Sequence, residues 1–315
     1  MKKIFYLTYA ENLFSPLLRR QVVELLDYIQ EKSMNNQITL VSFFPWYWLI
    51  AKKGQLRLFR KYISGLRINS MLIPLPYPFP IPAPFWKFYK NIGWRPYSKF
   101  TPIMTSFFLL IVFPVLIYFY FFKKVKIFHC RSYPISFPVM ILKKILPNIR
   151  FIFDPRSDYP EENVTSGSWR RTDLSFRFWK WAESQLLCGS DVTICISEIY
   201  KEHFRKNTQN FQYKIIPNNV NISQFYFDND FRKEYRLAMG LNNKVIFCYL
   251  GNMLPYGWNR PDIYAKVILS YRDLQKDHIF LFLVPKRANP LIKQVFTDYA
   301  IDDNEYVLEN PHYSE

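Results

Sequence analysis

The sequence has few of the residues that build metal centres and disulfide frameworks. Its 315 residues include four cysteines and four histidines. No two of the cysteines form a Cys-x-x-Cys pair, and they lie far apart at Cys130, Cys188, Cys195 and Cys248. This spacing favours buried thiols in a reducing compartment over disulfides, and the scarcity of histidine argues against a His/Cys zinc site. We therefore expect neither a metal nor a bound cofactor.

Acidic residues are scarce in the first half of the chain. Residues 1–150 carry 22 Lys and Arg against 4 Asp and Glu, a balance of +18, whereas residues 151–315 carry 20 against 21, a balance of −1. Such one-sided charge favours nucleic acid, an anionic membrane surface or an anionic substrate as partner. Zinc-finger spacing, RNP-like aromatic signatures and basic heptads are missing from the sequence, which argues against nucleic acid. An anionic membrane fits better, because each basic residue near its surface contributes about 1 kcal/mol.

A charged loop follows a short apolar run near the middle of the chain. The run Phe151–Phe153 predicts a buried strand. In an open α/β sheet, ligands bind beyond the carboxyl ends of the strands, so charged groups at a strand end indicate a site. An ordinary solvent-exposed loop is the alternative. The charged residues of this loop are Asp154, Arg156, Asp158, Glu161 and Glu162.

Three parts follow one another in a fixed order between residues 150 and 221. They are the charged loop, a long amphipathic segment that leads into SDVTICIS, and a strand that ends in IPNNV. This order resembles the acceptor-side domain of bacterial glycosyltransferases of family 4, which have the GT-B fold, especially the branch with an FDxRG…E pattern near the middle of the chain. The resemblance extends from the first predicted strand to about Glu315.

The resemblance implies an α/β, GT-B-like fold with two Rossmann-like domains facing a cleft. The N-terminal acceptor-side domain is expected over residues 1–225, and the start of a C-terminal nucleotide-sugar-binding domain over residues 226–315. From Asn242 the apolar pattern itself restarts as strand, turn and helix. The family's later strands and glutamate-containing donor segment have no counterpart in the sequence, so a truncated second domain is expected.

The resemblance also implies roles for charged residues at the strand ends. His129 and Arg131 follow the apolar run Val125–Phe128 in a segment that matches the family's HxRS pattern. A lone histidine can equally be structural, so both interpretations of His129 stay open. Catalytic roles fall on His129, Asp154 and Arg156. Acceptor-binding roles fall on Arg131, Glu161 and Glu162.

Donor-side candidates lie in the second predicted domain. Family members have a glycine at the first turn of this domain and basic residues nearby, which hold the donor diphosphate. Gly251 and Asn252 follow the strand-like run KVIFCYL and match that turn. Arg260, Lys286 and Arg287 are donor-binding candidates through their charge and strand-end positions only. An ordinary surface cation is the alternative for each of the three.

Two further positions are compared with the family pattern. The helix predicted over Asp173–Leu187 carries Glu183, where the family usually has a glutamate. A surface charge, or a partner for Arg177 or Lys180, is the alternative for Glu183. The segment IPNNV replaces the family's IPNG, and Asn219 can keep that turn because asparagine tolerates a left-handed backbone.

The amino-terminal segment MKKIFYLTYAEN predicts the first step of a Rossmann-like sheet. Its apolar run is about seven residues long, the lower limit for a secretory leader, and Glu11 follows it directly. We predict a strand over Lys3–Tyr9, a loop over Ala10–Ser15 and a helix from Pro16. Family members have a glycine-rich turn in this loop, whereas this sequence has no glycine there. The difference argues against close approach of a phosphate to the backbone.

Two segments interrupt the predicted sheet. Residues 73–102 hold eight prolines, a density that excludes helix interiors and sheet centres and predicts a polyproline-like loop.

Residues 103–122 are a run of twenty residues without a charge, followed by two lysines. A strand on each side predicts a crossover helix for this segment. Three placements remain open for it: packed on the sheet with one face touching lipid, fully buried, or spanning the membrane.

Together these features predict a glycosyltransferase without a metal requirement. We expect it to move a sugar from a nucleotide-sugar to a lipid-linked saccharide for capsule, lipopolysaccharide or a related surface glycan, with retention. The expected location is the cytoplasmic face of the plasma membrane, with peripheral attachment to its anionic surface. The alternative is a non-catalytic, truncated remnant that binds membrane or partner enzymes through its basic half.

Overall fold

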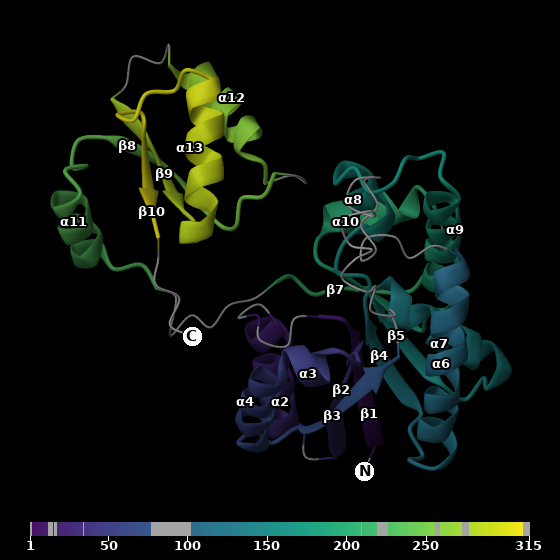
Figure 1. Ribbon diagram of the computed structural model, residues 1–315. Coiled ribbons are helices and arrows are strands. Elements are labelled where there is room, and N and C mark those ends of the chain that lie inside the picture. The colour runs from purple at the N-terminus through teal and green to yellow at the C-terminus, as the bar shows by residue number, and fades with distance from the viewer. Residues whose placement is uncertain are drawn as a thin grey trace. The chain divides into compact units, whose positions relative to one another are not determined.

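The chain forms two compact units (Figure 1). The computed structural model describes residues 2–11, 15, 18–33, 35–76, 102–208, 210–218, 226–255, 259–272 and 277–310, without the side chains of residues 103 and 104. Unit 1 comprises Met1–Val164 and Ser168–Val220, and unit 2 comprises Thr165–Gly167 and Asn221–Glu315. The domain division expected from the sequence, at 225/226, falls five residues after the division between the units.

Unit 1 is built on a parallel sheet with seven strands among its described residues, in the order β3-β2-β1-β4-β5-β6-β7. The chain moves outward from β1 to β3 and then returns to pair β4 with the other side of β1. The sheet therefore has a topological switch point between β1 and β4, where ligands bind in open α/β sheets. The strands are β1 (Lys2–Tyr9), β2 (Asn36–Pro45), β3 (Asn69–Leu75), β4 (Ile127–Arg131), β5 (Arg150–Asp154), β6 (Val192–Cys195) and β7 (Tyr213–Ile215).

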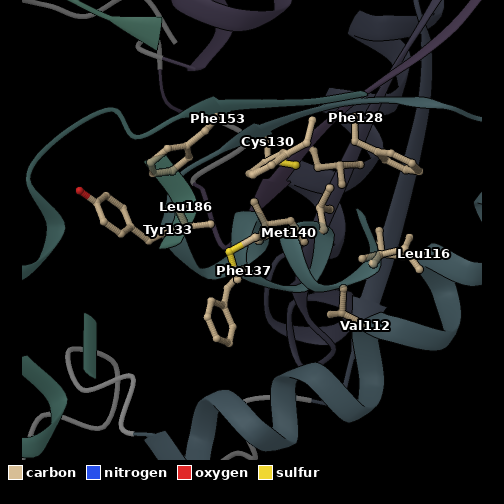
Figure 2. Close-up of a cluster of buried hydrophobic side chains, with 14 of the residues drawn as sticks. Val112, Leu116, Phe128, Cys130, Tyr133, Phe137, Met140, Phe153 and Leu186 are labelled. Atoms are coloured by element: carbon tan, nitrogen blue, oxygen red, sulfur yellow. The ribbon is translucent and has the colours of Figure 1, made fainter. Parts of the chain in front are cut away.

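Helices cover both faces of this sheet, because alternate strand residues point to opposite sides. One face packs against η1 (Arg19–Val23), α2 (Glu24–Lys32), α3 (Trp48–Ala51) and α4 (Lys53–Ser64). The other face packs against α6 (Pro102–Phe121), α7 (Tyr133–Ile145), α8 (Tyr159–Thr165), α9 (Leu174–Gly189) and α10 (Glu198–Arg205). Figure 2 shows part of this second core, with Phe128 and Phe153 from the strands and Val112 and Leu116 from α6.

Helix α6 lies between the edge strand β3 and the central strand β4 in the sequence, as the crossover interpretation predicts. Thr105, Phe108, Val112, Leu116 and Phe119, at helical spacing, are buried. The opposite side of the helix is exposed, which excludes the fully buried placement. Among the described residues, the structure has no helix with the length and apolar character needed to cross a membrane.

The proline-rich segment needs one correction. Strand β3 continues through Pro74 to Leu75, so the first three residues of the predicted loop are a strand. Because β3 is the edge strand of the sheet, Pro74 can lack an N–H without breaking a central ladder. Residues 77–101 lie outside the described residues, as does Asn219.

Unit 2 contains, in its described residues, a smaller parallel sheet in the order β10-β9-β8. Residues such as Phe280, Phe282 and Phe296 form its core. The two parallel sheets confirm the predicted α/β class. The elements of this unit are α11 (Asn229–Ala238), β8 (Val245–Leu250), α12 (Pro261–Tyr271), β9 (His278–Leu283), η2 (Lys286–Ala288), α13 (Asn289–Asp298) and β10 (Tyr306–Glu309).

Candidate functional site

Three neighbouring strands of unit 1 each end in a residue with a left-handed backbone. Ala10 follows β1 with φ 51°, Ser132 follows β4 with φ 79°, and Arg156 lies just beyond β5 with φ 67°. Non-glycine residues adopt positive φ rarely and at a cost of about 1–3 kcal/mol each, and such residues cluster at functional sites. The three strand ends flank the switch point of the sheet, so the strain and the expected ligand site coincide.

Charged side chains converge at the same edge. Arg131 has a side chain that is 3% exposed and donates from Nε to Glu11 Oε1 at 2.6 Å. Its Nη1 lies 3.8 Å from Asp154 Oδ2, which also accepts a hydrogen bond from Tyr6 Oη at 3.2 Å. His129 Nε2 lies 3.7 Å from the same carboxylate oxygen. We call Tyr6, Glu11, His129, Arg131, Asp154 and Arg156 the strand-end cluster.

The electrostatics of the cluster keep Asp154 ionised. Burial alone raises the pKa of this carboxyl, but His129, Arg131 and Arg156 outweigh burial and hold the pKa of Asp154 below its ordinary value. Burial, reinforced by the Asp154 charge, raises the pKa of Tyr6, so its hydroxyl stays a neutral donor. His129 Nε2 is buried and has no hydrogen-bond partner among the described residues. A buried polar atom of this kind is available to a ligand.

Arg156 joins the cluster through a residue that the sequence did not indicate. Its Nη1 donates to Gln21 Oε1, and the same oxygen accepts from Arg131 Nη2 at 3.3 Å. Gln21 lies in η1, a single turn of π-helix. Such turns are rare and often occur at functional sites. Two guanidinium groups are therefore held side by side by one amide oxygen.

Glu161 and Glu162, the two predicted acceptor carboxylates, have their direct partners outside this cluster. Glu162 accepts a hydrogen bond from Ser157 at 2.7 Å, and Glu161 pairs with the exposed Arg171 at 2.9 Å. Burial raises the pKa of Glu162, with Arg156 opposing the shift. The charge of Arg156 therefore acts on Glu162. The direct partner of Glu161 is instead the exposed Arg171.

Glu183 belongs to a second, internal network. Its side chain is completely buried and accepts from Lys180 Nζ and from Tyr133 Oη, each at 2.6 Å. Asp158 lies 3.9 Å from Lys180 Nζ and pairs with His203 at 2.5 Å. Of the alternatives given for Glu183, the partnership with Lys180 is confirmed, and a surface charge is excluded because the side chain is buried. The side of α9 that carries Glu183 packs against the core, and Trp179 and Leu186 are buried on the same helix.

Sequence reasoning named four members of the strand-end cluster and missed two. His129, Arg131, Asp154 and Arg156 were expected at neighbouring strand ends, and the structure brings them together. Glu11 and Tyr6 were not named as site residues. Glu11 had a usable signal, because it follows the first predicted strand as closely as Arg156 follows the strand that ends at Asp154. Tyr6 had none, since an aromatic residue within a strand normally indicates packing.

In unit 2 the predicted donor residues lie around the carboxyl ends of the strands. Gly251 follows β8, and a Cβ atom built there would come within 2.6 Å of Tyr249 Oη. Arg260 precedes α12 and pairs with Asp262 at 3.1 Å. Lys286 and Arg287 are exposed on η2. All three cations lie in segments that follow the carboxyl end of β8 or β9.

Three asparagine residues of unit 2 carry buried side-chain oxygens without a hydrogen-bond partner among the described residues. They are Asn252, Asn289 and Asn310. Asn252 follows β8, Asn289 begins α13, and Asn310 directly follows β10. Only Asn252 was named from the sequence. Unsatisfied buried acceptors at a strand-end edge are suited to a ligand with N–H or O–H donors.

The chemistry available to these groups is polar recognition and charge stabilisation. Within the described parts of the chain, no group of three or more His, Cys, Asp or Glu side chains is placed to hold a metal ion. The strand-end cluster offers an ionised carboxylate, an imidazole nitrogen 3.7 Å from it that has no hydrogen-bond partner among the described residues, and a guanidinium. Such groups can bind hydroxyl and phosphate oxygens.

No protein-family model and no curated protein sequence matches the chain. Solved structures match nearly its whole length. HepE from Anabaena in complex with UDP and glucose has 11% identity and a TM-score of 0.51, with 98% of this chain and 69% of HepE covered. The N-terminal domain of trehalose-6-phosphate phosphatase from Candida albicans has 11% identity and a TM-score of 0.55, with 99% and 74% covered. An E. coli structure of trehalose-6-phosphate bound with UDP-2-fluoro glucose has 10% identity and a TM-score of 0.55, with 100% and 74% covered.

Identities this low establish the fold alone. Together with the seven-stranded and three-stranded parallel sheets, the matches show that this chain has an α/β fold of the GT-B, Rossmann-like kind.

Proposed function

We propose that the protein is a retaining, family-4-like glycosyltransferase that moves a sugar from a nucleotide-sugar to a lipid-linked saccharide for a surface glycan. The observation that carries the proposal is the strand-end cluster at the β1/β4 switch point of a GT-B-like fold. Its supporting features are the ionised Asp154, the unpartnered His129 Nε2 and the left-handed strand ends. These are concentrated where an acceptor would bind in an open sheet.

Each member of the cluster has a role in the proposal. Asp154 and His129 bind the attacking acceptor hydroxyl, and Arg156 supplies positive charge that stabilises the transition state. Arg131 was expected to bind the acceptor. Its donors are engaged by Glu11, Gln21 and Tyr6, so its proposed role is instead that of a positioning residue that holds Asp154. Glu161 and Glu162, at the start of α8, contact more distant acceptor hydroxyls.

The donor is proposed to bind unit 2. The buried oxygens of Asn252, Asn289 and Asn310 accept hydrogen bonds from the nucleotide, and Arg260, Lys286 and Arg287 attract the diphosphate. Gly251 allows the chain to turn beside Tyr249. HepE was solved in complex with UDP and glucose, which supports a nucleotide-sugar as ligand of this fold. No step requires a metal, because catalysis rests on positioning and charge stabilisation.

The membrane is the proposed location of the acceptor. The excess positive charge of residues 1–150 supports peripheral attachment to the anionic, cytoplasmic face of the plasma membrane. Attachment would keep the catalytic residues close to a lipid-linked substrate.

Two measurements test the function. Isothermal titration calorimetry with UDP, GDP and common nucleotide-sugars should give binding that the substitution Asn310→Leu weakens at least tenfold. Incubation with the preferred nucleotide-sugar and bacterial membrane lipids should release nucleoside diphosphate only when lipid is present. Binding without release would support the non-catalytic alternative, and the absence of both would exclude the proposal.

A further inference from the structure

The outer side of α6 exposes several large apolar side chains. The helix contains no charged residue over Pro102–Phe121. Soluble proteins rarely expose contiguous apolar patches of more than a few hundred Å² without an interaction partner. The exposed residues on and just after the helix, with their exposed fractions, are Phe107 (51%), Leu110 (71%), Tyr118 (44%), Phe121 (58%) and Phe122 (75%).

These residues form one stripe along the helix. Phe107, Leu110, Tyr118 and Phe121 recur at intervals of three to eight residues, which places them on one side of an α-helix. The opposite side is fixed in the core through Phe108 and its buried neighbours. Because that packing holds the helix in one rotation, the stripe cannot turn inward without losing the core contacts.

Cations gather where the stripe ends. Lys123, Lys124 and Lys126 follow the helix and are exposed. Lys3 Nζ donates to Lys123 O at 3.0 Å, which adds a fourth cation to the group. Lys123 Nζ also lies 5.9 Å from the centre of the Tyr118 ring.

No carboxylate side chain occurs in the sequence between Glu31 and Asp154. The apolar stripe and its lysines are therefore not offset by acidic residues from α6 or from the segments next to it in the sequence. This combination matches a surface with an apolar interior and anionic headgroups.

We propose that the exposed stripe of α6 inserts into the interfacial layer of an anionic lipid bilayer, with the helix lying in the membrane plane. The proposal deepens the peripheral attachment given under the proposed function and rests on it. The aromatic side chains enter the headgroup and upper acyl region, and the four lysines meet lipid phosphates. The partner is a lipid surface rather than a second protein, because the apolar stripe ends in lysines and no acidic residue occurs on α6 or in the segments next to it in the sequence.

Helix α4 provides a comparison on the same unit. It also carries exposed cations and the exposed residue Leu58, and Ile50 of α3 is exposed beside it. This helix packs on the opposite face of the sheet from α6. A flat bilayer cannot cover the outer sides of both α4 and α6, so substitutions on α4 and the adjoining α3 form a matched control.

The experiment is co-sedimentation of the full chain with sucrose-loaded vesicles. The vesicles contain either phosphatidylcholine alone or phosphatidylcholine with phosphatidylglycerol. Leu110→Gln/Phe121→Gln should lower partitioning onto the mixed vesicles at least tenfold, and the control Ile50→Gln/Leu58→Gln should change it less than twofold. Thermal unfolding should show that both variants fold. If the α6 double variant does not fold, the single substitution Phe107→Gln should lower partitioning about threefold.

Several outcomes would overturn the proposal. They are absence of wild-type binding to the mixed vesicles, equal losses for the two double variants, and a dimer by light scattering that Leu110→Gln/Phe121→Gln converts to a monomer. The last would assign the stripe to a second copy of the chain. Partitioning needs no nucleotide, so a failure of the catalytic proposal in the calorimetric assay would be recognised separately.

Discussion

Arg131 and Glu11 form a 2.6 Å ion pair between residues that are 120 positions apart in the sequence. The pair ties the end of β4 to the residue that follows the β1 turn. The two strands are neighbours at the switch point of the sheet. The contact therefore fixes the position of the buried Arg131 guanidinium, which lies 3.8 Å from the Asp154 carboxylate.

Loss of the Glu11 charge should destabilise unit 1. The Glu11→Gln substitution leaves Arg131, which is 3% exposed, with fewer charged partners. We expect a decrease of about 1–3 kcal/mol in the free energy of unfolding, measured by urea denaturation. Glu24→Gln is the control, because Glu24 pairs with Arg19 on the surface and its loss should cost no more than about 0.5 kcal/mol. An equal decrease in the free energy of unfolding for the two variants would contradict the structural role of Glu11.

The left-handed backbone of Ala10 predicts that a glycine at this position would stabilise the protein. Ala10→Gly removes the Cβ clash at φ 51° and should raise the free energy of unfolding by up to about 1 kcal/mol. The same substitution at Ala51, at the end of helix α3, should instead lower it by about 0.5–1 kcal/mol. Urea denaturation of both variants measures the contrast, and a loss of stability at Ala10 would show that the turn is not strained.

Arg156 should affect turnover more than stability. If its guanidinium has the proposed catalytic role, Arg156→Ala should lower kcat at least tenfold, a loss of more than about 1.4 kcal/mol of transition-state stabilisation. Arg171→Ala is a matched control, since Arg171 is an exposed arginine paired with Glu161 further along the same segment. Donor-release kinetics and thermal unfolding are measured together. Activity within a few-fold of wild type, or a loss matched by unfolding, would remove Arg156 from the site.

Asp191 should make the free energy of unfolding depend on pH in the acid range. Burial alone raises the pKa of this carboxyl, but Lys143, the Phe151 N–H and Arg150 outweigh burial and lower the pKa in the folded state. A depressed folded-state pKa contributes stability that is present above the unfolded value, near 3.9, and is lost as pH falls through the folded value.

The corresponding measurement compares wild type with Asp191→Asn. At pH 7 the variant should be less stable by on the order of 1 kcal/mol, a value reduced by the partial exposure of the pair. The difference should shrink as pH falls from 4 toward 3, because wild type then loses the same charge. A difference that stayed constant over this range would show that the carboxylate charge contributes nothing.

Much of the fold follows from local patterns in the sequence. Apolar runs such as Phe151–Phe153 mark strands because a parallel sheet is buried on both faces. The helix over residues 103–122 was predicted to within one residue at each end, since a strand on each side leaves only a crossover connection. Ser197 caps α10 as its residue type favours, and its Oγ accepts from the Tyr200 N–H at 3.2 Å.

Other features depended on contacts between distant segments. The sequence placed Asp154, Asp158 and Glu162 on one charged loop, but the left-handed backbone at Arg156 divides that loop. Asp154 then faces Tyr6 and His129, while Asp158 pairs with His203. Proximity along the chain could not reveal this separation, because the direction of each side chain is set by one backbone turn.

The sequence by itself determined the parallel α/β class, the strand-end positions of the charged residues and the asymmetry of charge between the two halves. Only the tertiary structure decided which of those residues meet. Glu11 and Gln21 reach Arg131 because β4 returns to the side of β1, a pairing made by long-range hydrogen bonds rather than local propensity. In the same way, the charge-free sequence of α6 fixed its apolar character, whereas packing on the sheet decided which of its residues face outward.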